Sequence, residues 1–299
     1  MKSGFAGIIG RPNVGKSTLM NCILGEKIAI TTDKPQTTRN TIRGIYTRME
    51  EGEAVSQTVF IDTPGIHKAR NKLGSSMNQS ALNTFKEVDV ILFMVDSPYE
   101  GEGSGDDYIL KLVKEVGTPK ILVINKIDRM APDDFKKTFE TYEAMGVFDE
   151  VLGVCAADGT NVDKLLERVE AKLPEGPMYF PEDMITESPE RFIVSEIIRE
   201  KLLMYLDDEV PHGVAVEIES YVEEEDLTSI SAVIYCEKQS HKGMIIGKEG
   251  RKLKGVGKAA RLEIEALLGT KVFLQTHVKV KERWRDSDIA IKNFGYTES

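Results

Sequence analysis

The residues best suited to chemistry form one stretch near the start of the chain, Gly10-Arg11-Pro12-Asn13-Val14-Gly15-Lys16-Ser17. This stretch lies between an apolar run at 5–9 and a helical segment that begins at Thr18. The GxxxxGK[ST] spacing predicts backbone N–H groups around a phosphate, Lys16 on the β- and γ-phosphates, and the Ser17 hydroxyl on Mg²⁺. A glycine-rich turn with a chance lysine is the alternative, and the position between strand and helix disfavours it. We therefore predict a nucleotide site.

Two later motifs also follow apolar strands, where a parallel sheet places its ligands. In Asp62-Thr63-Pro64-Gly65 we expect Asp62 to hold Mg²⁺ through water and the Gly65 N–H to meet the γ-phosphate. In Asn125-Lys126-Ile127-Asp128, the Asp128 carboxylate is suited to accept hydrogen bonds from the N1–H and exocyclic amine of guanine, a donor pair that adenine lacks. An isolated Asn-Lys-x-Asp turn is weak support, but this one follows the other two motifs in order. The predicted ligand is GTP or GDP.

Two further segments complete the predicted site. The polar loop at 31–40 is rich in threonine, and a threonine hydroxyl is able to join the Mg²⁺ shell only while the γ-phosphate is present. We favour Thr38 for this role, with Thr37 as the close alternative. The remaining alternative is an ordinary threonine-rich loop that binds no metal. After the last strand comes Cys155-Ala156-Ala157, where the Ala156 N–H is placed to recognise the guanine O6. By itself this last segment is weak support for a guanine site.

The composition bounds the class of protein. A chain of 299 residues with 41% hydrophobic content suits two globular domains. Its three cysteines, Cys22, Cys155 and Cys236, lie far apart, which excludes a disulfide framework or zinc signature and predicts a reducing cytosol. The first strand begins a few residues after Met1, so we expect no signal peptide, and no apolar run is long enough for a membrane span. We expect a cytoplasmic protein, at most peripheral to a membrane.

The first 173 residues alternate β-rich and helical stretches, which predicts a mostly parallel sheet flanked by helices. A turn at Glu50-Glu51-Gly52-Glu53 predicts one antiparallel hairpin at the edge of this sheet. The Pro-rich stretch 174–189 reads as a linker to a second domain. The predicted strands of the first domain are residues 5–9, 41–49, 56–61, 88–95, 120–124 and 150–154.

The region after residue 190 changes pattern. We expect a helix at 191–206, strands at 214–219 and 229–235, a Gly247-Lys248-Glu249-Gly250 turn, a helix at 251–268 and a strand at 271–281. This order of elements around a GxxG turn resembles a KH domain, which implies that the turn lets a nucleotide backbone approach closely, because side chains there would clash. Between Lys238 and Arg285 there are 13 cations and four carboxylates in a chain whose net charge is −10. This concentration predicts a phosphate-backbone surface, whereas lysines that only solubilise a helix are the alternative.

Three aromatic or histidine residues in this region have no clear role from the sequence alone. Trp284 either stacks on a base or packs the C-terminal segment. His241 and His277 show no metal-ligand spacing, and we assign them surface roles at most. The predicted RNA-binding residues are Lys242, Ile246, Gly247, Lys248, Glu249, Gly250, Arg251 and Lys252.

The motifs GRPNVGKS, KPQTTR, DTPGIHK, NKID and KGMIIGKEG together resemble the Era family of GTPases, over essentially the whole chain. The resemblance implies an α/β P-loop GTPase domain at 1–173, a linker at 174–189, and an α+β type II KH-like RNA-binding domain at 190–299. It implies GTP hydrolysis with Mg²⁺ as the metal and slow intrinsic turnover. It further implies single-stranded rRNA at the 3′ end of the small-subunit rRNA as partner, a role in small-subunit assembly, a monomer, and peripheral association with the inner face of the cell membrane.

The chain departs from the pattern of small GTPases at two positions. Ile66 stands where a catalytic glutamine follows the DxxG box, so hydrolysis is expected to rely on positioning and charge, with Lys16, Thr38 and Gly65 as the catalytic groups. Cys155 replaces the usual serine, with little expected loss because that contact is made by the backbone. Asn13 matches an asparagine that coordinates potassium in related GTPases, which implies K⁺ activation.

The segment after Ile66 is expected to continue the switch, and Gly74, Ser75 and Ser76 suggest mobility. Its basic residues, from His67 to Lys72, either face RNA or a partner or belong to a solvated loop. The predicted nucleotide-binding residues are Gly10, Arg11, Pro12, Asn13, Val14, Gly15, Lys16, Ser17, Thr18, Asp62, Thr63, Pro64, Gly65, Asn125, Lys126, Asp128, Cys155, Ala156 and Ala157, and the predicted metal ligands are Ser17, Thr38 and Asp62.

Two other classes of function remain alternatives. An RNA-binding module with a purely structural nucleotide would show no coupling between hydrolysis and RNA binding. A nucleotide-dependent kinase would need an acceptor pocket and a base for the acceptor hydroxyl, and the sequence indicates neither.

Overall fold

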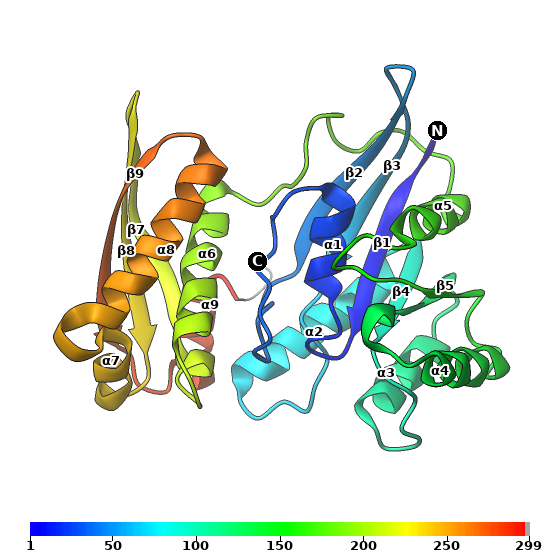
Figure 1. Ribbon diagram of the computed structural model, residues 1–299, viewed down its shortest axis with the longest axis horizontal. Coiled ribbons are helices and arrows are strands. Elements are labelled where there is room, and N and C mark those ends of the chain that lie inside the picture. The colour runs from blue at the N-terminus through cyan, green and yellow to red at the C-terminus, as the bar shows by residue number, and fades with distance from the viewer. Residues whose placement is uncertain (297–299) are drawn as a thin grey trace. The chain divides into compact units, whose positions relative to one another are not determined.

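A computed structural model describes residues 1–296, which fall into two compact units (Figure 1). The first unit contains residues 1–29, 38–70 and 74–187, and the second contains 30–37, 71–73 and the chain from Ser188 onward. Two short segments from the N-terminal half therefore cluster with the C-terminal half. The boundaries 1–173, 174–189 and 190–299 stay a prediction, and residues 297–299 of that last range lie outside the described residues.

The first unit is built on a six-stranded sheet in the order β2-β3-β1-β4-β5-β6. Only β2 runs antiparallel, paired with β3 through the turn at Glu50–Glu53, and the other pairs are parallel. The prediction of a mostly parallel sheet with one antiparallel edge strand is confirmed. The strands are β1 Lys2–Gly10, β2 Ile42–Glu50, β3 Glu53–Asp62, β4 Val90–Val95, β5 Lys120–Ile124 and β6 Glu150–Gly153.

Helices cover both faces of this sheet, which is why its central strands read as continuous apolar runs. On one face, α2, α3 and α4 contribute Phe85, Ile109 and Tyr142 to a core that includes Phe93 of β4 and Ile124 of β5. On the other, α1 and α5 contact β1 (Figure 1). The helices are α1 Lys16–Leu24, α2 Lys72–Glu87, α3 Gly105–Lys114, α4 Pro132–Ala144 and α5 Val162–Lys172.

The start of α2 corrects one expectation. Gly74, Ser75 and Ser76 lie in its first turns, and not in a mobile loop. The reason is the helical spacing of Leu73 and Met77, whose burial stabilises the helix in spite of the small residues between them.

The second unit combines a three-stranded sheet, in the order β7-β8-β9, with helices α6 and α8, which contact each other and the sheet. Strand β7 pairs with β8 antiparallel and β9 pairs with β8 parallel. Apolar side chains such as Ile197, Ile234 and Val256 form its core. The elements are α6 Glu190–Tyr205, β7 Ala215–Glu223, β8 Leu227–Cys236, α7 Gln239–Ile246, α8 Arg251–Leu268, β9 Lys271–Val280 and α9 Asp288–Asn293.

Helix α7 directly precedes the GxxG turn and was missing from the expected element order. It has only eight residues, and only His241 and Ile245 are buried, so its sequence carries little periodicity. His241 is 3% exposed, with Nε2 3.6 Å from Glu209 Oε1, so the surface role assigned to it is wrong.

Trp284 begins the short 3₁₀ helix η4 Trp284–Asp286 and is fully buried. Its indole N–H donates to the Gly213 carbonyl at 2.8 Å, and its ring meets Phe294 edge-on at 5.2 Å between centroids. Of the two alternatives for this residue, packing of the C-terminal segment is correct and base stacking is not. Within residues 1–296, no helix has both the length and the apolar character needed to cross a bilayer.

Candidate functional site

The loop between β1 and α1 curls back at the carboxyl end of β1, with Gly15 in a left-handed conformation at φ 104°. A Cβ at Gly15 would lie 2.2 Å from the Asn125 side-chain nitrogen, so only glycine fits. Asn125 Nδ2 donates to the Val14 carbonyl at 2.8 Å. The first and third predicted motifs are therefore in direct contact.

Lys16 is the first residue of α1 and is 5% exposed. Its ammonium donates to the carbonyls of Arg11 at 2.9 Å and Gly10 at 3.3 Å, within its own loop. Burial lowers the pKa of Lys16 to about 8, and the nearby Asp62 carboxylate opposes that shift. The side chain is thus a buried cation held against two carbonyls of its own loop, which is suited to an incoming anion.

Ser17, Thr38 and Asp62 bring three oxygen-bearing side chains together. The Ser17 hydroxyl donates to Asp62 Oδ2 at 2.5 Å and shares a hydrogen bond with Thr38 Oγ1 at 2.8 Å. Asp62 is fully buried, its pKa is raised to about 6 by that burial, and its Oδ1 has no hydrogen-bond partner in residues 1–296. Two hydroxyls and a carboxylate with a spare buried oxygen fit the oxygen ligands that Mg²⁺ prefers.

The structure separates the two candidate threonines of the polar loop. Thr37 Oγ1 donates to the Lys34 carbonyl at 2.6 Å, within the loop itself. Thr38 is the one whose hydroxyl reaches Ser17.

The Asp62–Gly65 motif lies against the phosphate-binding loop. A Cβ at Gly65 would lie 2.5 Å from the Pro12 backbone nitrogen, and the Ile66 N–H donates to the Gly10 carbonyl at 3.3 Å. The Ile66 side chain is buried in the apolar core, so it does not face the site where a catalytic glutamine would act. The Thr63 hydroxyl donates to the Ile8 carbonyl at 2.8 Å and fixes the turn.

His67 is also held in place, because Asn78 of α2 bonds both its N–H and its carbonyl, at 3.3 Å and 2.7 Å.

A pocket beside the loop gathers the residues predicted to recognise the base. Cys155 Sγ donates to Asp128 Oδ1 at 3.2 Å and orients that carboxylate. The Ala156 N–H, expected to face a base oxygen, donates to Asn125 Oδ1 at 3.0 Å. The pocket is lined by Gly15, Thr18, Asn125, Lys126, Asp128, Arg129, Cys155, Ala156 and Ala157.

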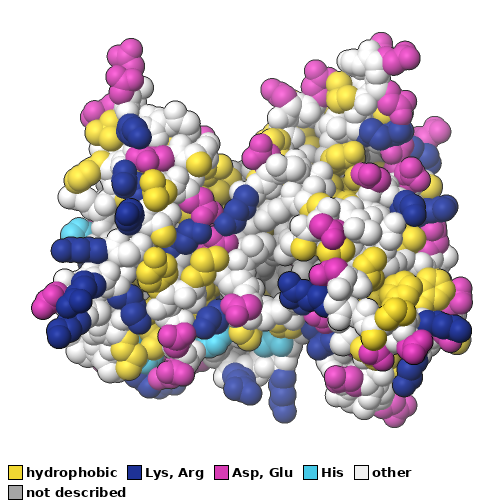
Figure 2. Space-filling model, viewed as in Figure 1, with side chains coloured by type: hydrophobic (Ala, Val, Ile, Leu, Met, Phe, Trp, Pro, Cys, Tyr) yellow, Lys and Arg dark blue, Asp and Glu magenta, His cyan; other side chains and the backbone are white. Residues whose placement is uncertain are grey.

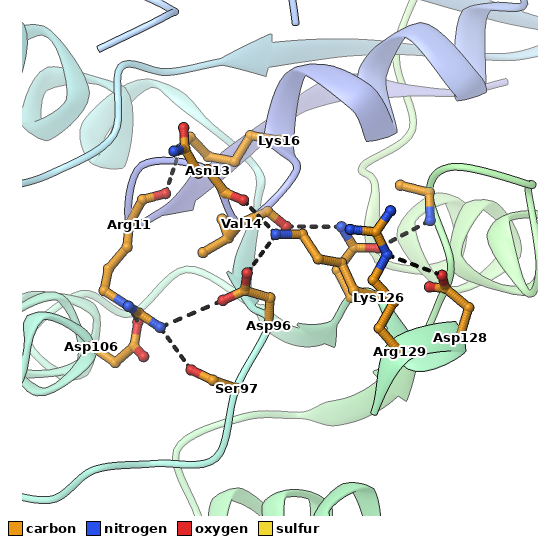
Figure 3. A network of polar contacts seen from close by, with 12 residues as sticks. Arg11, Asn13, Val14, Lys16, Asp96, Ser97, Asp106, Lys126, Asp128 and Arg129 are labelled. Atoms are coloured by element: carbon orange, nitrogen blue, oxygen red, sulfur yellow. Dashed lines mark hydrogen bonds and ion pairs between the residues drawn. The ribbon is translucent and has the colours of Figure 1, made fainter. Parts of the chain in front are cut away.

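Sequence reasoning missed a polar network at the carboxyl end of β4 (Figure 3). Asp96 accepts from Lys126 Nζ at 2.6 Å and lies 3.5 Å from the Arg11 guanidinium. Arg11 also bonds Asp106 of α3 at 2.8 Å and Ser97 at 2.9 Å. The network ties the phosphate-binding loop to the base-recognition motif, and the one available signal was an acidic residue directly after a buried strand.

Lys126 completes this link by donating to the Asn13 carbonyl at 2.7 Å.

The second candidate site is the GxxG turn between α7 and α8. Gly247 and Gly250 have φ of 70° and 74°, and a Cβ at Gly247 would lie 2.7 Å from the Lys252 Cβ. A Cβ at Gly250 would meet nothing within 4 Å, so its surface is open. Lysine and arginine side chains gather over α7 and α8 (Figure 2), and in the described part of the chain Lys248, Lys252, Lys254 and Lys258 form no ion pair.

The other predicted residues of this surface lie on the same two helices or in the turn itself. Lys242 and Ile246 are half-buried on α7, and Arg251, the first residue of α8, is exposed and ion-paired with Glu249 at 3.1 Å.

Comparison with known proteins agrees with this geometry. Residues 5–126 match the family described as 50S ribosome-binding GTPase, and residues 209–285 match the KH domain. GTPase Era of Alkaliphilus oremlandii (strain OhILAs) is 55% identical over 299 residues, covering 99% of each chain. GTPase Era of Clostridioides difficile (strain 630) is 54% identical over 300 residues, again covering 99% of each.

Two solved structures superpose over the whole chain. Era of Aquifex aeolicus, a variant bound to GDP.AlF4−, is 38% identical with a TM-score of 0.93 and 100% coverage of both chains. Era in complex with MgGDPNP and nucleotides 1506–1542 of 16S ribosomal RNA gives the same identity, TM-score and coverage. On the strength of these matches, together with the converging nucleotide motifs and the GxxG turn, the chain belongs to the Era family of GTPases.

Proposed function

We propose that this chain is a GTP-hydrolysing switch that binds single-stranded 16S rRNA and acts in assembly of the small ribosomal subunit. The observation that carries the proposal is the convergence of Lys16, the Ser17–Thr38–Asp62 cluster and the Asp128 pocket around one loop. The relative solved with both MgGDPNP and 16S rRNA nucleotides supports the pairing of nucleotide and RNA.

In the phosphate half of the site, Lys16 exchanges its bonds to the Gly10 and Arg11 carbonyls for phosphate oxygens. Mg²⁺, when bound, neutralises phosphate charge, with Ser17 and Thr38 as ligands and Asp62 acting through water. The Gly65 N–H meets the γ-phosphate. Because the catalytic groups Lys16, Thr38 and Gly65 stabilise charge without orienting the attacking water, intrinsic turnover is slow.

In the base half, Asp128 accepts two hydrogen bonds from guanine, and the Cys155 thiol holds the carboxylate in place. The backbone around Ala156 and Ala157 receives the base oxygen. Because the Ala156 N–H already donates to Asn125, the O6 either shares that N–H or takes the one that follows it.

Potassium activation is proposed for Asn13, which has a left-handed conformation at φ 65° at the rim of the loop. Turnover measured at equal ionic strength in KCl and NaCl tests this, and equal rates would dispose of it.

The RNA surface is proposed to be the GxxG turn and the flanking ends of α7 and α8. Backbone phosphates approach the open face at Gly250, and the unpaired lysines of α8 neutralise them. The residues assigned are Lys242, Ile246, Gly247, Lys248, Glu249, Gly250, Arg251 and Lys252.

The deciding experiment measures nucleotide and RNA in one preparation. GTP should outcompete ATP for binding, phosphate should appear in solution, and RNA should accelerate its release. Lys16→Ala should abolish hydrolysis and should also change RNA affinity. If RNA affinity is untouched by Lys16→Ala and turnover ignores RNA, the chain is an RNA-binding module with a structural nucleotide.

Several finer properties follow from the family and are proposed with it. We propose that 1–173 and 190–299 act as the GTPase and KH-type domains joined by 174–189, in a monomer of the cytoplasm. Association with the small subunit is checked by co-sedimentation with 30S particles. Peripheral membrane association is checked by flotation with anionic vesicles.

A further inference from the structure

Helix α6, the first helix of the second unit, buries four charged side chains within six consecutive positions, 196–201. Arg199 and Glu200 are fully buried, Glu196 is 5% exposed and Lys201 is 9% exposed. Buried charges of this kind are rare, because each loses its hydration and must be paired. Stability alone does not require them, since well-packed apolar residues in their place are often neutral or stabilising. Their partners therefore indicate what they do.

Glu200 fastens the start of the 30–37 segment. Its Oε1 accepts the Thr31 N–H at 2.9 Å, and its Oε2 accepts from Lys201 at 2.7 Å. Lys201 has a second carboxylate partner in Glu263 of α8. The Thr31 N–H is thus held by a buried carboxylate. Lys201 would keep its ion pair with Glu263 if Glu200 were replaced.

Arg199 fastens the other end of the same segment. Its Nε donates to Glu196 Oε1 at 2.7 Å, and its Nη2 bonds both Glu196 and the Thr37 carbonyl. Lys34, between the two ends, lies 3.5 Å from Asp207 beyond the end of α6. Adjacent residues of one helix therefore hold the first and last parts of the segment.

The residue after Thr37 is Thr38, whose hydroxyl shares a hydrogen bond with Ser17 at 2.8 Å. Consecutive Cα atoms are fixed about 3.8 Å apart by the trans peptide. The Thr37 carbonyl belongs to the peptide that joins Thr37 to Thr38, so a bond that holds this carbonyl restricts the backbone conformations open to Thr38.

We propose that Arg199 and Glu200 are positioning residues that clamp the 30–37 segment and so present Thr38 to Mg²⁺ during GTP hydrolysis. The inference rests on the proposed function, because it assigns Thr38 to the metal. By linkage, a nucleotide that orders Thr38 also favours the state in which α6 holds the 30–37 segment. Helix α6 in turn contacts α8, which belongs to the proposed RNA surface.

The test compares the Mg²⁺ concentration for half-maximal GTP hydrolysis in four variants. Glu200→Ala removes the acceptor of the Thr31 N–H and should raise that concentration about tenfold. Glu200→Gln keeps an acceptor oxygen and should restore a value near wild type. The double variant Glu196→Gln/Arg199→Met removes both charges of the ion pair together, so that neither charge is left buried without its partner. This variant should also raise the Mg²⁺ concentration for half-maximal hydrolysis. Arg191→Met, at an exposed position on the same helix, is the control.

GDP affinity measured in EDTA reports the nucleotide pocket without the metal, and it should be equal in all variants. The wild-type chain, which must hydrolyse GTP in a Mg²⁺-dependent way, separately tests the proposed function. The inference is overturned if Glu200→Ala and the double variant, with thermal transitions close to wild type, keep the wild-type Mg²⁺ requirement. It is also overturned if Glu200→Gln raises the Mg²⁺ requirement as much as Glu200→Ala does, because the negative charge of Glu200 and not its hydrogen bond to the Thr31 N–H would then be responsible.

Discussion

Asp128 is the single side chain on which the choice of base depends. Asp128→Asn replaces one acceptor oxygen with a donor, so the amide mismatches the 2-amino group of guanine but matches the 2-oxo group of xanthine. We expect GTP affinity to fall by at least about 100-fold and XTP to become the preferred ligand. Competition binding with GTP, XTP and ATP measures this, with Asp133→Asn on the exposed start of α4 as control. An unchanged preference for GTP would contradict the assigned role.

Asp96 makes a prediction of its own, since it joins Lys126 to Arg11. Asp96→Asn keeps the size of the side chain but removes the charge that both cations share. We expect GDP affinity to fall about three- to tenfold, through faster dissociation, because the loop and the base-recognition motif lose their common anchor. Stopped-flow release of a fluorescent GDP analogue gives the rate. Ser97→Ala, which removes one neutral bond to Arg11, should have a smaller effect.

The residue types of the site were predictable, and their partners were not. Motif spacing was sufficient to single out Lys16, Ser17, Asp62 and Asp128, because each lies at a fixed offset in a motif that follows a buried strand. Choosing Thr38 over Thr37 requires the loop path, which depends on contacts with residues more than 160 positions later. The burial of Trp284 likewise depends on Gly213 and Phe294, which no local pattern relates to it.

At the scale of elements, the start of α3 supports the site through Asp106 and itself depends on Asp107. The Asp107 carboxylate bonds Lys111 and the Gly103 N–H, each at 2.8 Å, and these bonds lower its pKa to about 2. A depressed pKa stabilises the fold above the unfolded value near 4, and that contribution disappears as pH falls from about 4 to 2. Asp107→Asn should therefore lower the free energy of unfolding at pH 7 but have little effect near pH 2.

Denaturant unfolding of both proteins at pH 7, 4 and 2 gives this difference. A difference that persists undiminished at pH 2 would show that the carboxylate charge is not responsible.

The GxxG turn is the second element with a sharp prediction. Gly250→Asp adds a negative side chain where the structure leaves open space, and we expect RNA affinity to fall at least about tenfold while RNA-free GTP hydrolysis is unchanged. Gly269→Asp is a matched control, because Gly269 has nearly the same conformation, φ 67° against 74°, and equally open surroundings at the end of α8. Fluorescence anisotropy with a labelled single strand measures both. Equal losses in the two variants would assign the effect to backbone strain.

Elements with strong local patterns were predictable, including the buried strands β4 and β5 and the long helices α6 and α8. Helix α7 was not, because a short helix with two buried residues is stabilised by its neighbours more than by its own sequence. The same holds for the 30–37 and 71–73 segments, whose membership in the second unit depends on tertiary contacts alone.

At the scale of the whole molecule, the charge of the chain is distributed unevenly. The chain carries a net charge of −10, yet 13 cations and four carboxylates lie between Lys238 and Arg285. Because the acidic remainder repels nucleic acid, we expect RNA contacts to concentrate on α7, α8 and the turn between them. We therefore expect the affinity for RNA to depend on the conformation of that surface, and we expect the bound nucleotide to influence this conformation.

The nucleotide and the RNA should consequently influence each other's binding. If the 30–37 segment and Thr38 respond to the γ-phosphate, a single strand matching the 3′ end of 16S rRNA should bind more tightly with GDPNP than with GDP, by a factor of roughly 5 to 150. Thermodynamic reciprocity requires the same RNA to raise GDPNP affinity, relative to GDP affinity, by the same factor. Isothermal titration in both directions measures the two factors, with Gly250→Asp as the control that should lose both. Equal RNA affinity in the two nucleotide states would mean that the second unit does not sense hydrolysis, and the chain would then be two binding modules on one polypeptide and no switch.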